Sequence, residues 1–167
     1  MITVEEIKSL LNLTPQQKEG GYFTETYRSH HQLSNDALPD SYGGERSLAT
    51  AIYYLLTPDT FSEMHRLPAD EVFHFYLGDP VEMLQLLPDG SGKVITLGPD
   101  ILNGMHPQII VMKGIWQGAR LLPGGKFALL GTTMSPGFEF ADYESGKRDV
   151  LIELYPQFRD LISILTR

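Results

Sequence analysis

The sequence predicts an all-β domain, built as a sandwich or small barrel, with short helices only at its two ends. Sixteen glycines and eleven prolines are spread between short apolar runs, which is typical of strands joined by tight turns. Apolar residues recur at helical spacing only near the N-terminus and after residue 147. We therefore expect a single domain, with a helix within residues 1–14, a barrel over 20–141 and helices over 147–167.

The first element is expected to be a helix over residues 4–12. Thr3 and Glu6 have the spacing of a capping box, Ile7 belongs to an apolar face, and Pro15 ends the pattern. A strand over Tyr22–Arg28 then follows two glycines. Strict alternation puts Tyr22, Thr24, Thr26 and Arg28 on one face of this strand and Phe23, Glu25 and Tyr27 on the other.

Neither face of that strand is purely apolar, so we expect it to border a pocket or a subunit interface, with Tyr27 as a candidate ligand contact. The polar stretch over residues 29–47 is long for a loop, and such loops are often lids or binding loops. Further strands are expected over residues 48–56, 61–65, 71–77, 81–87, 93–97, 108–112, 116–122, 127–134 and 138–140, and Pro156 is expected to separate two C-terminal helices.

Residues 61–78 carry most of the side chains suited to chemistry. Residues two apart on a strand share a face, so we expect Glu63 and His65 to point the same way. Glu71 opens the next strand and shares a face with Phe73 and Phe75, where a carboxylate is costly unless it is paired or used. The pattern predicts a pocket with these polar groups above an aromatic floor.

His74 lies three residues after Glu71, so the two side chains fall on opposite faces of a regular strand. A regular strand therefore places it on the outer face or at an interface, and only a bulge would turn it inward. Gln117, from a strand further along the chain, is expected to face the pocket, whereas its neighbour Trp116 faces away.

Composition excludes several classes of protein. The formal net charge is −8, with 13 basic and 21 acidic residues, so the chain lacks the basic surface of a nucleic-acid binder. It has no cysteine, no apolar run of the roughly 20 residues that span a bilayer, and no secretory signal pattern. We expect a cytoplasmic protein that binds a small molecule and has neither nucleic-acid nor membrane partners.

The polar residues match a known pattern. Glu63, His65, Glu71 and Gly78 resemble, in spacing, the first motif of the cupin superfamily, and residues 112–117 have the spacing of the second, with Gln117 at its histidine. Residues 20–29, 65–74 and 116–119 resemble an uncharacterised branch of small cupins. The resemblance implies a double-stranded β-helix jelly roll, and it implies a homodimer.

The resemblance also implies candidate metal ligands at Glu63, His65, Glu71 and Gln117. Two of these four positions depart from the usual cupin set, and an amide is a poor ligand for divalent metals. No cofactor is therefore assigned, and a divalent metal remains an alternative.

Residues 19–27 bear a weaker likeness to the dTDP-sugar 3,5-epimerases, which are metal-free cupins with a His base and a Tyr acid. The leading hypothesis is that the protein binds a small polar ligand, with a carbohydrate or nucleotide-sugar as the best guess. It would then be an isomerase or epimerase with His65 and Glu71 as catalytic residues and with Tyr27 or Tyr53 as the acid. Glu63, Phe73, Phe75 and Gln117 complete the expected pocket. The alternatives are a metal-dependent oxygenase or isomerase and a non-catalytic sensor or interaction domain.

Overall fold

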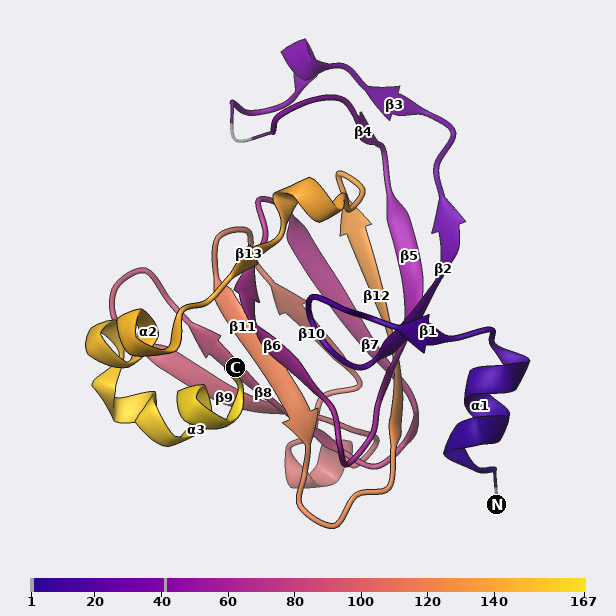
Figure 1. Cartoon of the computed structure of the whole chain (residues 1–167), viewed down its shortest axis with the longest axis vertical. Coiled ribbons are helices and arrows are strands. Elements are labelled where there is room, and N and C mark those ends of the chain that lie inside the picture. The colour runs from indigo at the N-terminus through magenta and orange to yellow at the C-terminus, as the bar shows by residue number, and fades with distance from the viewer. Residues whose placement is uncertain (1, 41) are drawn as a thin grey trace.

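Two antiparallel sheets face each other in the computed structural model, which describes residues 2–40 and 42–167 (Figure 1). One sheet has the strand order β1 (Thr14–Pro15), β2 (Tyr22–Arg28), β5 (Thr50–Leu56), β12 (Ala128–Ser135), β7 (Asp70–Gly78) and β10 (Gln108–Val111). The other has the order β13 (Glu144–Ser145), β6 (Phe61–Arg66), β11 (Trp116–Leu121), β8 (Val81–Leu86) and β9 (Gly92–Leu97). The predicted all-β fold class is confirmed.

Apolar side chains from both sheets fill most of the space between them. Phe73 and Tyr54 from the six-stranded sheet are each only 1% exposed, and they belong to one cluster with Met83 and Leu121 from the five-stranded sheet. Alternate residues of each strand therefore point into a shared interior, as a jelly roll requires. The polar site described below lies within this interior.

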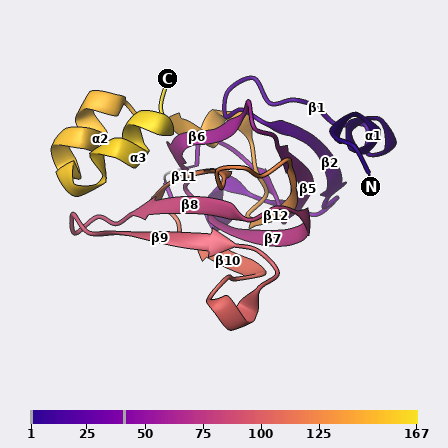
Figure 2. The same cartoon turned by 90° about the horizontal axis from the view of Figure 1, so that it is seen from below.

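Helices cover the outer faces of the sheets (Figure 2). Helix α1 (Val4–Leu10) begins at the predicted capping box of Thr3 and Glu6 and buries Ile7 against the six-stranded sheet. Helices α2 (Arg148–Leu154) and α3 (Arg159–Ile164), joined by the short helix η4 (Pro156–Phe158), pack on the five-stranded sheet. Within the part of the chain that is described, no helix is long and apolar enough to cross a membrane.

Two segments lie across one end of the barrel, which we call the mouth. The first is the long loop between β2 and β5, which carries β3 (Gln32–Leu33), η1 (Asn35–Ala37) and β4 (Arg46–Ser47). The second, residues 137–146, connects β12 to α2 and is called the strap (Figure 1). The strap contains η3 (Phe140–Asp142) and β13, and the strand expected over residues 138–140 does not form. The remaining short helix, η2 (Ile101–Asn103), precedes β10.

Strand β2 contains a bulge that overturns the predicted faces of Tyr27 and Arg28, whereas residues 22–25 alternate as predicted. Its register against β5 shifts between Glu25 and Tyr27, so that Glu25 lies opposite Ile52 and Arg28 opposite Thr50. The extra residue puts Glu25 and Arg28 on the same, inner face although they are three apart in sequence. Tyr27 instead lies opposite Ala51 on the outer face.

Strand β6 is also irregular, and this changes the expected relation of Glu63 to His65. His65 pairs with Gln117 of β11 and Ser62 pairs with Ala119, with a register shift between these two positions. Ser62 and His65 therefore share the inner face. The expectation that Glu63 and His65 project together from a regular strand is wrong, because the bulge takes Glu63 out of the alternation.

Candidate functional site

His65 lies in the barrel interior and is only 1% exposed. Its Nδ1 atom is 2.6 Å from the backbone carbonyl oxygen of Glu63. A carbonyl only accepts hydrogen bonds, so Nδ1 carries the proton and the lone pair of the neutral imidazole is on Nε2. Among the described residues, Nε2 makes no hydrogen bond. The backbone thus fixes the tautomer and leaves the lone pair of Nε2 without a protein partner.

Glu71 and Gln117 extend the site across the interior from β7 and β11. The Nε2 amide of Gln117 donates to Oε2 of Glu71 at 2.7 Å, and both side chains are buried. Burial and the nearby charge of Glu19 raise the pKa of Glu71 to about 7, although His65 and Gln117 act in the opposite direction. Glu71 therefore changes its protonation state near neutral pH.

The amide of Gln117 is only half satisfied. Its Oε1 atom is buried and has no hydrogen-bond partner within residues 2–40 and 42–167. An unpaired buried acceptor costs about 1–3 kcal/mol, so such groups commonly mark places where a ligand or water supplies the missing partner. Gln117 is thus positioned to accept one hydrogen bond from a bound molecule.

Glu19 is a site residue that the sequence did not indicate. It precedes β2, and one of its carboxylate oxygens accepts a hydrogen bond from the hydroxyl of Ser62 at 2.5 Å. Together with burial, its charge raises the pKa values of Glu71, Tyr54 and Tyr143. The only sequence signal was its place at the start of the epimerase-like stretch.

Tyr143 from the strap completes the cluster. Its ring stacks on the imidazole of His65, with ring centres 4.7 Å apart and planes inclined by 18°. Its hydroxyl is buried without a partner among the described residues, and burial with the charges of Glu19 and Glu63 raises its pKa above the ordinary value of 10. The hydroxyl therefore keeps its proton at neutral pH and is available as a donor.

Two hollows border this cluster: Glu19 and Glu71 line the inner one and Tyr143 lines the outer one, while His65 and Gln117 line neither. A cavity of about 70 Å³ borders Glu71 and Glu19, with apolar walls from Phe23, Ile52 and Phe138. A larger pocket of about 800 Å³ lies at the mouth, between the long loop, the end of β6 and the strap. Both are lined by Leu67 and Glu139, so only these side chains and their neighbours separate the inner cavity from the mouth pocket.

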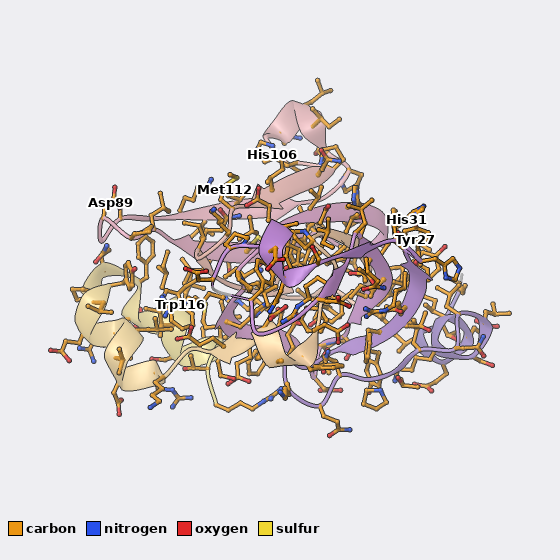
Figure 3. The ribbon with its side chains drawn as sticks, turned by 90° about the horizontal axis from the view of Figure 1, so that it is seen from above. Tyr27, His31, Asp89, His106, Met112 and Trp116 are labelled. Carbon is orange, nitrogen blue, oxygen red and sulfur yellow. The ribbon has the colours of Figure 1, made fainter. Side chains whose placement is uncertain are left out.

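The two tyrosines nominated from sequence as acids lie elsewhere. Tyr27 is 54% exposed on the outer side of β2, away from both hollows (Figure 3). Tyr53 packs edge-on against Tyr76, also on the outer side. Neither can reach His65, because alternation directs them away from the interior.

The other predicted residues lie on the inner or outer face of the sheets as the alternation along each strand predicts. Phe73 is buried in the interior and Phe75 packs beside the same cluster. His74 lies on the outer face, where it stacks on Tyr76 and contacts Gln108. Trp116 faces away from the interior and packs toward the C-terminal helices, with the guanidinium of Arg66 over its ring (Figure 3).

This geometry can be compared with known proteins. The sequence profile of DUF985, a family of the cupin superfamily, matches residues 5–146 of this chain. The chain belongs to this cupin family. An uncharacterised protein of Saccharomyces cerevisiae, YML079W, is 31% identical over 136 residues, which cover 77% of this chain and 68% of the yeast protein.

Solved structures agree with this assignment. Protein SO0799 of Shewanella oneidensis is 32% identical with a TM-score of 0.86, and the match covers 100% of this cupin and 99% of that chain. A hypothetical protein of Leishmania major is 30% identical with a TM-score of 0.88 over 99% of both chains. The cupin jelly roll is therefore established.

Many cupins hold a metal at the four positions that correspond here to Glu63, His65, Glu71 and Gln117, but the side chains of this cupin do not fit one. The carboxylate of Glu63 pairs with Arg167 at 3.2 Å, and Gln117 turns its N–H group toward Glu71. Across residues 2–40 and 42–167, no three His, Asp or Glu side chains gather as a metal site would need. His65 and Glu71 alone are too few donors to hold a divalent metal.

Proposed function

We propose that this cupin binds a small polar molecule beside His65 and Glu71 and transfers a proton to and from it. One observation carries the proposal: a histidine with a fixed tautomer lies in the same interior as a buried carboxyl group whose pKa is about 7, next to a cavity. Ionisable groups with perturbed pKa values that line a cavity are the expected parts of an acid–base site.

Each group of the cluster suits one role. Nε2 of His65 is the base, because its lone pair is free and the opposite ring nitrogen is held by the backbone. The hydroxyl of Tyr143 is the acid, in the place that we had expected Tyr27 or Tyr53 to fill. Glu71 and Gln117 orient the substrate through hydrogen bonds. Such a pair supports isomerisation or epimerisation at a carbon next to a carbonyl group.

The size of the two hollows restricts the ligand. Pockets for whole drug-sized ligands measure about 300–1,000 Å³, so the inner cavity of about 70 Å³ receives only a few heavy atoms. The mouth pocket of about 800 Å³ has room for the rest of a larger molecule. We therefore propose a carbohydrate or nucleotide-sugar whose reacting end enters the interior while its remainder lies at the mouth.

A ligand screen followed by an isotope-exchange assay tests the proposal. Sugars, sugar phosphates and sugar nucleotides are screened by thermal shift, and each hit is incubated with the protein in D₂O and followed by NMR. We expect incorporation of deuterium at one carbon, lost by at least about 100-fold in His65→Gln. The matched control is His74→Gln, on the outer face, which should exchange like wild type.

Other outcomes decide against the proposal. A hit that binds without exchange would support the non-catalytic sensor alternative. Stoichiometric iron, manganese or nickel in the purified protein, lost in His65→Gln, would support the metal-dependent alternative. An exchange rate equal in wild type and His65→Gln would remove the role of His65 as the base.

We also propose that the protein is a homodimer. The edge of β2 is paired with β1 only at Tyr22 and Phe23. In the described part of the chain its remaining residues have no strand neighbour on that side. Open strand edges favour pairing with a second copy, and the exposed ring of Tyr27 would be buried by it.

A further inference from the structure

Ion pairs attach the strap to the mouth of the barrel, and the strap is the negatively charged partner in each of them. Glu139 of the strap pairs with Arg28 at 2.7 Å, and Glu144 pairs with Arg66 at 2.7 Å. Asp142 accepts hydrogen bonds from two guanidinium nitrogens of Arg46, Nε and Nη2, and these two side chains are each only 6% exposed. In each pair the strap supplies the carboxylate and the rest of the protein supplies the arginine.

The strap is fixed more firmly at its ends than in its middle. Gly137 donates to the carbonyl of Ser47 at 2.7 Å, and at the other end Gly146 donates to the carbonyl of Met64 at 2.7 Å while β13 pairs with β6. Residues 139–143, which we call the lid segment, form no strand with either sheet. Side-chain contacts hold them instead: the ion pairs of Glu139 and Asp142, the contacts of Phe140 with Phe23 and Lys18, and the ring of Tyr143, which stacks on His65 and packs against a small apolar cluster.

The lid segment covers the route into the site. Glu139, Ala141, Asp142 and Tyr143 line the mouth pocket, and Glu139 and Phe140 line the inner cavity. The inner cavity of about 70 Å³ is too small for a sugar ring as long as the lid segment stays in place. A ligand that reaches His65 must therefore displace it.

Displacement changes the charge of the mouth. The carboxylates of Glu139 and Asp142 leave with the lid segment, whereas Arg28 and Arg46 stay on the body of the protein. Arg46 then loses its carboxylate partner, and Arg28 loses Glu139 but keeps Glu25. Arg66 stays paired with Glu144, which lies outside the lid segment. The fork of an arginine that holds a carboxylate in two hydrogen bonds also fits a phosphate. Although the chain as a whole carries a charge of −8, its opened mouth presents the guanidinium of Arg46 and the side of the Arg28 guanidinium that Glu139 had held.

We propose that Arg28 and Arg46 form a site that binds a phosphate or diphosphate group of the ligand. While no ligand is bound, the carboxylates of the lid segment occupy this site. The inference rests on the proposed ligand site at His65 and narrows its ligand to phosphorylated compounds, sugar nucleotides among them. The ligand anion replaces Glu139 and Asp142, and the lid segment opens as a consequence.

Pyrophosphate binding tests the site without any need to know the natural ligand. In calorimetric titrations at low ionic strength, Asp142→Asn and Glu139→Gln should bind pyrophosphate about fivefold more tightly than wild type, because the competing carboxylate is gone. Arg28→Gln, at a partly exposed pair, should bind it about fivefold more weakly. Loss of affinity, or no change, in both carboxylate variants would overturn the proposal.

Two controls separate this effect from others. Glu82→Gln removes the same kind of charge from the Arg120–Glu82 pair, whose residues line neither hollow, and should leave pyrophosphate affinity unchanged. His74→Gln, on the outer face, should also leave it unchanged. Pyrophosphate binding is measured without turnover, so failure of the isotope-exchange assay and failure of the anion site are distinguishable. An equal gain in Glu82→Gln would show an unspecific charge effect and would contradict the proposal.

Opening of the lid segment can be measured directly, because the chain has no cysteine. Met134 is buried and lines the inner cavity, so the thiol of Met134→Cys reacts with a water-soluble disulfide reagent only when the lid segment opens. The reaction should be about threefold or more faster when Asp142→Asn or Glu139→Gln is added, but not with Glu82→Gln. Equal rates in all four proteins would show that the lid segment does not open.

Discussion

The inner and outer faces of the six-stranded sheet carry similar aromatic and ionisable residues in opposite environments. Tyr54 points inward, is 1% exposed and donates to the carbonyl of Gly20 at 2.9 Å, and burial raises its pKa well above 10. Its chain neighbour Tyr53 points outward and packs against Tyr76. Adjacent residues of one type thus differ in the role they can play.

The same contrast holds for the ionisable residues of β7. Glu71 faces inward and has its pKa raised to about 7, while His74, three residues later, lies on the outer face among polar neighbours. The difference teaches that residue type alone does not identify a site in this fold. Burial and the partner groups across the interior decide which side chains have altered chemistry.

The largest difference between the faces should appear in stability. Phe73→Ala removes a buried ring from the core and should lower the free energy of unfolding by about 3–5 kcal/mol. Tyr76→Ala, at a residue 51% exposed on the outer face, should cost less than about 2 kcal/mol. Urea unfolding measures both, and similar losses would show that the interior is less tightly packed than the structure indicates.

The next effect concerns pH. The pKa of Glu71 is raised from its ordinary value of 4.5 to about 7, so between these values the folded protein holds a proton that the unfolded chain releases. The contribution of this proton to the free energy of unfolding totals roughly 3 kcal/mol. It is complete below pH 4.5 and is lost as pH rises through about 7. Glu71→Gln should remove this loss, so the variant should be the more stable protein at pH 8.

Unfolding measurements at pH 5 and pH 8 check this sign. The difference between the two pH values should shrink in Glu71→Gln but persist in Glu25→Gln, whose carboxylate is exposed and paired with Arg28. An unchanged pH dependence in Glu71→Gln would mean that the buried carboxyl group titrates normally.

A smaller effect separates two tyrosines inside the barrel. Tyr143→Phe removes a buried hydroxyl that has no partner in the described residues, so it should raise stability by about 1 kcal/mol. Tyr54→Phe breaks a hydrogen bond and should lower stability by about 1 kcal/mol. If Tyr143→Phe also slows deuterium exchange in the hit ligand, the hydroxyl serves catalysis at the expense of stability.

The smallest effect on stability is expected on the outer face. Tyr27→Lys should change monomer stability by no more than about 0.5 kcal/mol, because Tyr27 is largely exposed. The same change should weaken a dimer formed along β2, by placing two like charges at the interface. Light scattering after size-exclusion chromatography would show this, and a mass of one chain for the wild type would contradict the homodimer.

Much of the fold followed from the sequence, because local patterns determine strands, turns and helix ends. The helix with its capping box, the β strands between Gly/Pro turns and the helices around Pro156 form close to where they were expected. The strap was only partly anticipated. Its shape depends on pairs such as Arg46–Asp142, which join residues 96 apart in sequence and leave no local signal.

The candidate site was predictable only where strands are regular. The alternation of side chains along a strand predicted that Glu71, Phe73 and Gln117 face inward and His74 outward, as they do in the structure. It failed at Glu63 and along the second half of β2, because a bulge shifts alternation by one residue without a distinct sequence mark. Glu19 and Tyr143 were missed since they reach the interior from segments outside the main strands.

The bulge in β2 decides which side chain reaches the mouth of the barrel. Thr26 is the extra residue, and because the bulge absorbs it, Arg28 turns inward, opposite Thr50, and Tyr27 turns outward. Deleting Thr26 would leave Glu25 inward, Tyr27 outward and Arg28 inward in strict alternation, so the bulge would vanish while these side chains kept their sides. The same residues paired in regular register, with Thr26 included, would instead put the phenol of Tyr27 at the ligand entrance and the cation of Arg28 on the outer face.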